Sequence, residues 1–129
     1  MRRVPIARKA RARAHRSPQE PRTPPGWGED TRETVERRSG GRCEVRVHGC
    51  SDVATDLHHR QRRREGNHTP VNALHCCRHC HQTVHALPAV SRAAGWIVSA
   101  YADPATAAVR VRGRMVKFTD DGHTAPASV

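Results

Sequence analysis

The sequence predicts a small α+β protein that bound metal stabilises. The chain has 129 residues, enough for one domain, but only 19 of them are Leu, Ile, Val or Phe, which is too few for a large conventional core. It also has 10 His and 5 Cys, and seven of the His lie between His58 and His85. Because a metal ion can supply folding free energy that a thin core lacks, this clustering indicates a metal-dependent fold.

The charge of the chain indicates nucleic acid as its partner. There are 23 Lys and Arg residues, 21 of them Arg, against 12 Asp and Glu, so the net charge is +11. No run of about 18 apolar residues is present, and we expect no membrane partner. The basic N-terminus lacks the apolar stretch of a secretory signal. We therefore expect a cytoplasmic protein, with a transit peptide in residues 1–17 as the alternative.

Residues 1–28 are expected to form a disordered basic arm and a Pro-rich linker. Residues 1–16 contain seven basic and no acidic residues, and residues 17–28 contain four Pro and two Gly. Such a composition does not form a core. The arm is either a solvated tail or an electrostatic arm that holds DNA phosphates without sequence choice.

Short helices and strands are expected in the domain that follows, residues 29–118. A capping-box-like pair, Asp30 and Glu33, predicts the start of a helix over residues 31–39, and Gly40 predicts its end. Two short strands should follow, at residues 54–59 and 72–75, with a polar loop over residues 60–71 between them. Beyond them we expect a helix over 79–87 that ends before Pro88, a helical turn over 88–95, a strand over 96–101, hairpin strands over 109–112 and 114–118, and a flexible tail over 119–129.

Two pairs of cysteines predict a structural Zn²⁺ site. The pairs are Cys43 with Cys50 and Cys77 with Cys80. The second pair has the spacing of a zinc knuckle, and four thiolates close the coordination shell, so the site is expected to be structural rather than catalytic. Two alternatives stay open, because Cys76 could replace Cys77 and His48 could replace Cys50. Otherwise Cys76 is expected to be a small buried apolar residue.

Four histidines lie at positions where side chains could meet. His81 and His85 are four residues apart and therefore share one face of the predicted helix. The spacing is like that of zinc proteases, but Gln82 stands where their Glu would be, which excludes that activity. His58 and His59 end a strand and point to opposite faces, so only one of them can face a shared metal. Instead of a functional metal site, these four histidines could form a second structural zinc site or simply be exposed.

The cysteine and histidine motifs belong to one ordered set of segments. An opening with Cys43-Glu44-Val45 and Gly49-Cys50 is followed by Asp56-Leu57-His58-His59-Arg60, Asn72-Ala73-Leu74 and Cys77-Arg78-His79-Cys80-His81-Gln82-Thr83-Val84-His85. This ordered set resembles the HNH endonuclease family, in particular small zinc-stapled proteins of phages and prophages. The resemblance covers about residues 40–97. One departure is the run Arg62-Arg63-Arg64-Glu65-Gly66, which replaces a commoner Gly-rich stretch.

The resemblance implies a ββα-metal (His-Me finger) fold, with two antiparallel strands and one helix around a single divalent ion. It implies that His59 is the general base, for which an imidazole is suited at neutral pH. It also implies catalytic-metal ligands at His58, His81 and His85, a three-His set that looks like the arrangement in colicin-type nucleases. Three imidazoles favour Zn, Ni, Mn or Co over Mg, although the ion that supports turnover could be Mg, Mn, Ni or Zn.

Two further side chains receive roles near these histidines. The amide of Asn72 is expected to brace the loop and hold His59 in orientation, with a plain turn residue as the alternative. Asp56 is expected either to orient His58 as a hydrogen-bond acceptor or to be a solvated surface residue.

The arginines after His59 are expected to contact the DNA backbone, because a guanidinium suits phosphate geometry. These are Arg60, Arg62, Arg63 and Arg64; the alternative is a solvated run of charge.

The sequence thus predicts a metal-dependent endonuclease of double-stranded DNA, acting as a nickase or on both strands, with modest sequence specificity. The resemblance implies 3′-hydroxyl and 5′-phosphate ends and, by analogy, a role in phage genome packaging beside terminase. The competing prediction is a non-catalytic, zinc-stapled DNA-binding protein.

Overall fold

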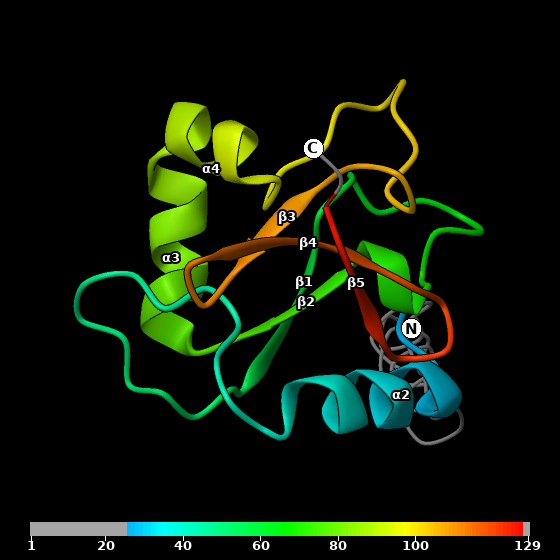
Figure 1. Ribbon diagram of the computed structural model, residues 1–129, viewed down its shortest axis with the longest axis horizontal. Helices are drawn as coiled ribbons and strands as arrows, with labels where there is room; N and C mark the ends of the chain where they lie inside the picture. The colour runs from blue at the N-terminus through cyan, green and yellow to red at the C-terminus, as the bar shows by residue number, and fades with distance from the viewer. Residues whose placement is uncertain (1–25, 128–129) are drawn as a thin grey trace, which may run out of the picture.

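Residues 26–127, the part of the chain that this computed structural model describes, contain three α-helices and two small antiparallel sheets (Figure 1). This confirms the predicted α+β class. The predicted basic arm lies almost entirely outside the described residues. None of the described helices is long and apolar enough to cross a membrane.

Helix α2 spans Glu29–Ser39 and begins earlier than predicted. The N-cap is Gly28, and no side chain caps the first turn. Asp30 lies within that turn instead, where its negative charge interacts favourably with the helix dipole. The predicted end is confirmed, because Gly40 adopts a left-handed conformation, with φ of 66°, and its N–H bonds back to the helix.

Strands β1 (Asp56–His59) and β2 (Ala73–Cys76) form an antiparallel pair close to the predicted positions. The loop between them ends in the short 3₁₀ helix η1 (Pro70–Asn72). Side chains alternate along a strand. As a result, β1 directs His58 to one face of the pair and His59 to the other.

Helix α3 (Arg78–Ala86) follows β2 after one residue, Cys77, which is its N-cap. The Cys77 thiol accepts a hydrogen bond from the N–H of Cys80. Helix α4 (Pro88–Ala94) comes next, with only Leu87 between the two helices. Because α3 packs against β1 and α2 packs against β2, the β1–β2 hairpin lies between α2 and α3 (Figure 1).

The second sheet has the strand order β3-β4-β5 and crosses the first hairpin in the view of Figure 1. Its strands are Val109–Val111, Arg114–Phe118 and Thr124–Pro126. The predicted hairpin around Gly113 is confirmed. Arg112 and Gly113 both have positive φ, 51° and 89°, as a two-residue type I′ turn requires.

Two predictions for the C-terminal third are wrong. The expected flexible tail from residue 119 contains β5, which pairs with β4 after a turn that includes Gly122 at φ 90°. Residues 96–101 form no strand. The first two N–H groups of that segment bond to the carbonyl of Ser91 in α4, so they are not available to a neighbouring strand.

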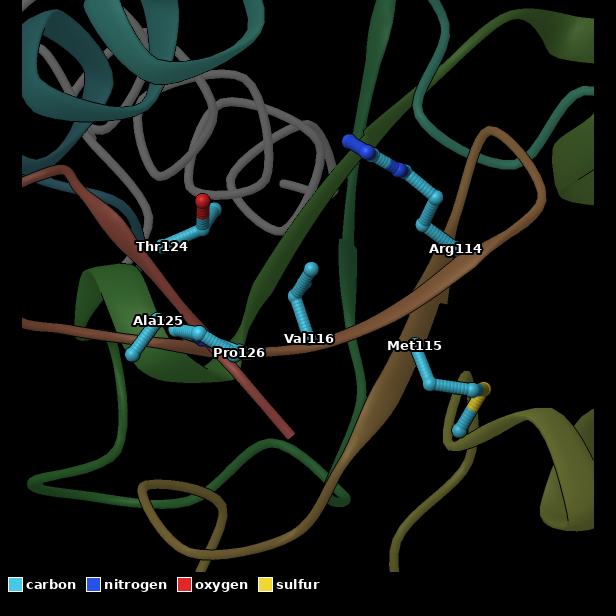
Figure 2. A pocket seen from close by; sticks show the side chains of 6 residues that line it. All are labelled: Arg114, Met115, Val116, Thr124, Ala125 and Pro126. Carbon is cyan, nitrogen blue, oxygen red and sulfur yellow. The ribbon is translucent and has the colours of Figure 1, made fainter. Parts of the chain in front are cut away.

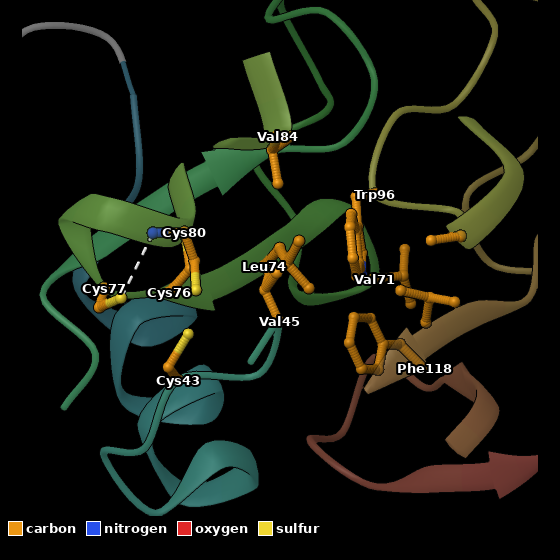
Figure 3. Packing of buried hydrophobic residues seen from close by; sticks show 12 residues of the cluster. Cys43, Val45, Val71, Leu74, Cys76, Cys77, Cys80, Val84, Trp96 and Phe118 are labelled. Atoms are coloured by element: carbon orange, nitrogen blue, oxygen red, sulfur yellow. Dashed lines mark hydrogen bonds between the residues drawn. The ribbon is translucent and has the colours of Figure 1, made fainter. Parts of the chain in front are cut away.

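The hydrophobic core connects the two sheets. A single cluster of buried side chains extends from the cysteines at one end to Trp96 and Phe118 at the other, with Leu74 between them (Figure 3). Trp96 is buried in this core, and its indole N–H donates to the carbonyl of Arg110 at 2.8 Å.

Arg60 is buried, which corrects the prediction that it contacts DNA. Its residue surface is 1% exposed. Its guanidinium donates hydrogen bonds of 2.7–3.1 Å to the carbonyls of Val71, Gly95, Pro104 and Ala107. Burial, together with the charge of Arg38, lowers the pKa of Arg60 to about 10, so it stays charged at neutral pH. Arg60 therefore joins η1, α4 and the loop before β3.

A second buried guanidinium connects α2 to the core. Arg38 forms a two-pronged ion pair with Glu44, with both N–O distances 2.8 Å, and each side chain is 2% exposed. The Arg38 guanidinium also lies 3.5 Å from the centre of the Phe118 ring. Glu44 accepts a further hydrogen bond from the N–H of His75 in β2. Both charges are thus paired, as burial requires.

Replacing Arg60 by Met is expected to lower the free energy of unfolding by about 3 kcal/mol or more, because four carbonyls lose their donors. Chemical denaturation at constant zinc concentration measures this change. Arg62→Met is the matched control, since Arg62 is exposed, and we expect a change within about 0.5 kcal/mol. Equal losses in the two variants would contradict the structural role of Arg60.

Candidate metal centres

The first candidate centre is a group of four thiols. The sulfur atoms of Cys43, Cys50, Cys77 and Cys80 all lie within 4.8 Å of one another. Two come from the loop before β1, and two come from the start of α3. This group could hold a structural metal ion such as zinc, and it is the set that the sequence predicts.

Local backbone geometry builds this thiol group. In the loop, Gly49 has φ of 89°, and a Cβ there would lie 2.6 Å from the imidazole of His79, so only glycine fits without strain. The N–H of Asp52 donates to the Cys50 sulfur at 3.2 Å. Burial alone would raise the pKa of Cys77, but hydrogen bonds from Ser51 and Cys80 lower it to about 6. A thiolate, the form that binds metal, is therefore accessible there.

The two alternative thiol-site ligands lie outside this group. Cys76 is fully buried in the hydrophobic cluster, and burial raises the pKa of its thiol. It is thus the buried apolar residue that we expected. The side chain of His48 does not belong to the group either.

The second candidate centre is a group of three imidazoles, from His58, His81 and His85. Their ligand nitrogens also lie within 4.8 Å of one another, and the ring centres are 5.1–5.2 Å apart. His58 comes from β1, whereas the other two lie one turn apart on α3. The predicted three-His set is therefore brought together.

In two of these rings one nitrogen makes a hydrogen bond within the protein, and the other nitrogen is left for a metal ion. Nε2 of His58 lies 2.9 Å from the carbonyl oxygen of Trp96 and must donate to it, so Nδ1 keeps a free lone pair. Nδ1 of His81 lies 2.8 Å from the carboxylate of Asp56, which leaves Nε2 free. Metal-binding histidines usually have such acceptors on their other nitrogen. These residues therefore fit a divalent transition-metal ion.

Asp56 orients His81 and not His58, which corrects one expectation. Its carboxylate also pairs with Arg78 at 2.8 Å. Partial burial would raise the pKa of Asp56, but hydrogen bonds from His81, Arg78 and Thr55 lower it to about 2. The carboxylate is thus charged at neutral pH, and its contact with Nδ1 fixes the orientation of the His81 ring.

Burial keeps His58 neutral. It lowers the pKa of His58 to about 4, and the nearby His81 and His85 rings act in the same direction, against the opposing effect of the Trp96 carbonyl. A neutral imidazole is the form that binds metal. At neutral pH the ring needs no deprotonation before an ion binds.

His59 lies in a separate environment on the other face of β1. Its Nε2 is 2.9 Å from Nδ1 of His68, and its ring stacks on the indole of Trp27, with centres 3.9 Å apart and planes inclined by 17°. Burial, together with the electrostatic effects of the neighbouring His68 and Arg63, lowers the pKa of His59 to about 4, so the ring is neutral at pH 7. Sequence reasoning did not single out His68 or Trp27, since one lies in a polar loop and the other in a Pro-rich linker.

Asn72 braces the loop after His59, and its side-chain hydrogen bonds go to that loop rather than to His59. Its carbonyl accepts from the N–H of Gln61 at 2.7 Å, and its amide donates to the carbonyls of Gln61 and Asn67 at 3.1 and 3.0 Å. The side chain is fully buried. The expected bracing is therefore confirmed, while the direct hold on His59 is not, and Asn72 is no plain turn residue.

Two hollows of similar size differ in their relation to these centres. One, of about 440 Å³, is lined in part by Trp27, Asp56 and His81 and so opens beside the imidazole group. The other, of about 450 Å³, lies between β4 and β5 (Figure 2). None of the predicted site residues lines the second hollow.

Exchange of Cys80 for Ala is expected to abolish the thiol site, while Cys76→Ala keeps it. With Co²⁺ in place of zinc, thiolate-to-cobalt charge transfer gives a near-ultraviolet absorption band that reports the sulfur ligands. We expect this band in the wild type and in Cys76→Ala, and its loss in Cys80→Ala together with the fold, because the ion contributes about 10 kcal/mol or more. A band of full strength in Cys80→Ala would exclude the proposed ligand set.

Removing the charge of Asp56 is expected to weaken metal binding by the three imidazoles. We expect Asp56→Asn to reduce the affinity for Mn²⁺ or Zn²⁺ about 10- to 100-fold, as measured by competition titration with the thiol site already loaded. Asp121→Asn is the matched control, because Asp121 pairs with an exposed His123 at 3.1 Å, far from both centres along the chain. If both variants bind like the wild type, Asp56 does not support the site.

Comparisons with known proteins add no identification. No family model matches the chain, and no curated protein and no solved structure matches it either. The function is therefore inferred from the two ligand groups and from the residues around His59.

Proposed function

We propose that the protein is a metal-dependent endonuclease of the HNH type that hydrolyses phosphodiester bonds in double-stranded DNA. In this proposal β1, β2 and α3 form a ββα-metal module, and the four thiols form its structural zinc site. One observation carries the proposal: a three-imidazole group and a separately held, neutral His59 lie on opposite faces of one short strand. Hydrolysis of a phosphodiester needs both a cation and a base.

The chemistry assigns a different task to each face of β1. A water molecule attacks phosphorus, the bond to the 3′ oxygen breaks, and the products are a 3′-hydroxyl and a 5′-phosphate. His59 accepts the proton of the attacking water, for which its neutral ring is suited. An ion bound to His58, His81 and His85 would stabilise charge on the scissile phosphate and on the leaving oxygen.

DNA binding is assigned to the exposed arginines that remain after the correction for Arg60. Arg62, Arg63 and Arg64 follow directly after the buried pair Arg60 and Gln61, and their surfaces are exposed. Their position close to His59 in the chain supports phosphate contacts beside the cut. Phosphate contacts position a protein but carry little sequence information, so modest specificity is expected. The family resemblance alone suggests a cytoplasmic role in phage genome packaging, beside terminase.

The second candidate is a non-catalytic DNA-binding protein with a structural zinc. The thiol group and the net charge of +11 are compatible with it. Binding alone, however, has no use for three imidazoles whose ligand nitrogens converge, nor for a separately held His59. The arrangement of the histidines therefore favours the nuclease.

Plasmid nicking tests this proposal. The wild type is expected to nick supercoiled plasmid when Mg²⁺, Mn²⁺, Ni²⁺ or Zn²⁺ is added, and His59→Ala is expected to cut about 10²- to 10⁴-fold more slowly, which is the usual contribution of a general base. His123→Ala is the control, since its side chain is 77% exposed in a turn outside the site. A wild type that binds DNA but cuts it with no metal would refute the nuclease function. A folded His59→Ala variant that cuts normally would refute only the proposed role of His59 and would leave the nuclease function standing.

A further inference from the structure

We propose that His68 is a positioning residue for His59: it accepts a hydrogen bond from Nε2–H of His59 and so leaves Nδ1 as the nitrogen that takes a proton. Trp27 assists by fixing the plane of the His59 ring. The direction of this hydrogen bond and its catalytic consequence both rest on the proposed nuclease function. The arrangement itself can be tested without any activity.

The contact between the two rings is directional. Nε2 of His59 and Nδ1 of His68 are 2.9 Å apart, and the ring planes are inclined by 73° with centres 5.1 Å apart. This is the geometry of a hydrogen bond and not of a stack. One ring must donate and the other must accept, because a neutral imidazole carries a single N–H.

The requirement for a free lone pair determines which ring donates. If His68 donated, Nε2 of His59 would accept, and the single proton of His59 would lie on Nδ1, so neither nitrogen could act as a base. If His59 donates from Nε2, its Nδ1 keeps the lone pair. Only this second arrangement is compatible with a base at His59, and it places the proton of His68 on its own Nε2.

Trp27 removes the remaining freedom of the His59 ring. The indole lies almost parallel to the His59 imidazole, with ring centres 3.9 Å apart. It also lies at a steep angle to the His68 ring, with ring centres 5.8 Å apart and planes inclined by 77°. Rotation of His59 about its side-chain bonds would break both the stack and the hydrogen bond. Trp27 thus fixes the plane of the His59 ring, and the hydrogen bond to His68 fixes the direction of its Nε2 atom.

Side-chain hydrogen bonds hold the backbone of His68 and of the residue before it. The hydroxyl of Thr31 in α2 donates to the carbonyl of His68 at 3.0 Å. The preceding residue, Asn67, bonds through its side chain to the carbonyl of Arg62 and the N–H of Arg64, at 2.7 and 3.0 Å. Asn72 in turn donates to the carbonyl of Asn67 at 3.0 Å. Asn72 therefore acts on His59 through the loop that carries His68.

Nitrogen-15 spectra of the imidazole rings test the hydrogen-bond direction. Two-bond ¹H–¹⁵N correlations distinguish a protonated ring nitrogen from one with a lone pair, in the full-length, zinc-loaded chain at neutral pH. We expect His59 to be protonated at Nε2 in the wild type. We expect a mixture of both tautomers in His68→Leu, which has no acceptor, and the wild-type pattern in His68→Asn, whose amide oxygen can accept. Protonation at Nδ1 in the wild type, or an unchanged pattern in His68→Leu, would overturn the proposal.

Plasmid nicking supplies the catalytic arm of the test. His68→Leu is expected to cut roughly 10-fold or more slowly at unchanged DNA affinity and zinc content, and His68→Asn is expected to recover most of the rate. His123→Leu is the control for loss of an imidazole elsewhere. Equal rates in His68→Leu and the wild type would also overturn the positioning role. If the wild type cuts no DNA, the nuclease function fails, and the nitrogen-15 spectra alone decide on His68.

Discussion

The rest of the candidate site depends on the attachment of the first turn of α3 to the thiol group. Cys77 caps this helix and Cys80 lies one turn inside it. Successive residues of a helix differ by a constant rotation, so a fixed Cys80 also fixes the directions of His81 and His85. Because β2 runs directly into Cys77, the same attachment fixes β2 and, through strand pairing, His58. A zinc ion at the thiols would contribute about 10–16 kcal/mol of binding free energy, comparable to the whole net stability of a typical domain.

Buried guanidinium groups replace part of the apolar volume that the composition lacks. Arg60 donates to four carbonyls in three separate segments, and Arg38 forms a paired contact with Glu44 under the ring of Phe118. Each of these side chains satisfies backbone or carboxylate groups that burial would otherwise leave unpaired. The positive charge is consequently not all on the surface. The buried guanidinium groups bind loops together, a task that aliphatic side chains perform in a larger core.

The sequence predicts what depends on local spacing and fails where distant contacts decide. The spacing of Cys77 and Cys80, that of His81 and His85, and the alternation along β1 are properties of single elements, and the structure agrees with all of them. By contrast, Arg60 and Arg62 are the same residue type two positions apart, yet one is buried and one exposed. That difference comes from carbonyls 11–47 residues away. The same holds for β5 and for the contacts of His59.

The surroundings of His59 are the strongest physical argument for catalysis over simple binding. His59 belongs to neither ligand group, yet Trp27 and His68 restrict its ring, and buried amides restrict the loop behind His68. Restricting a side chain costs conformational entropy, and a DNA-binding imidazole gains little from a fixed tautomer. A general base does gain, because proton transfer requires one particular nitrogen with a free lone pair in a defined direction. A hydrolytic reaction of the proposed kind would therefore account for the order around His59.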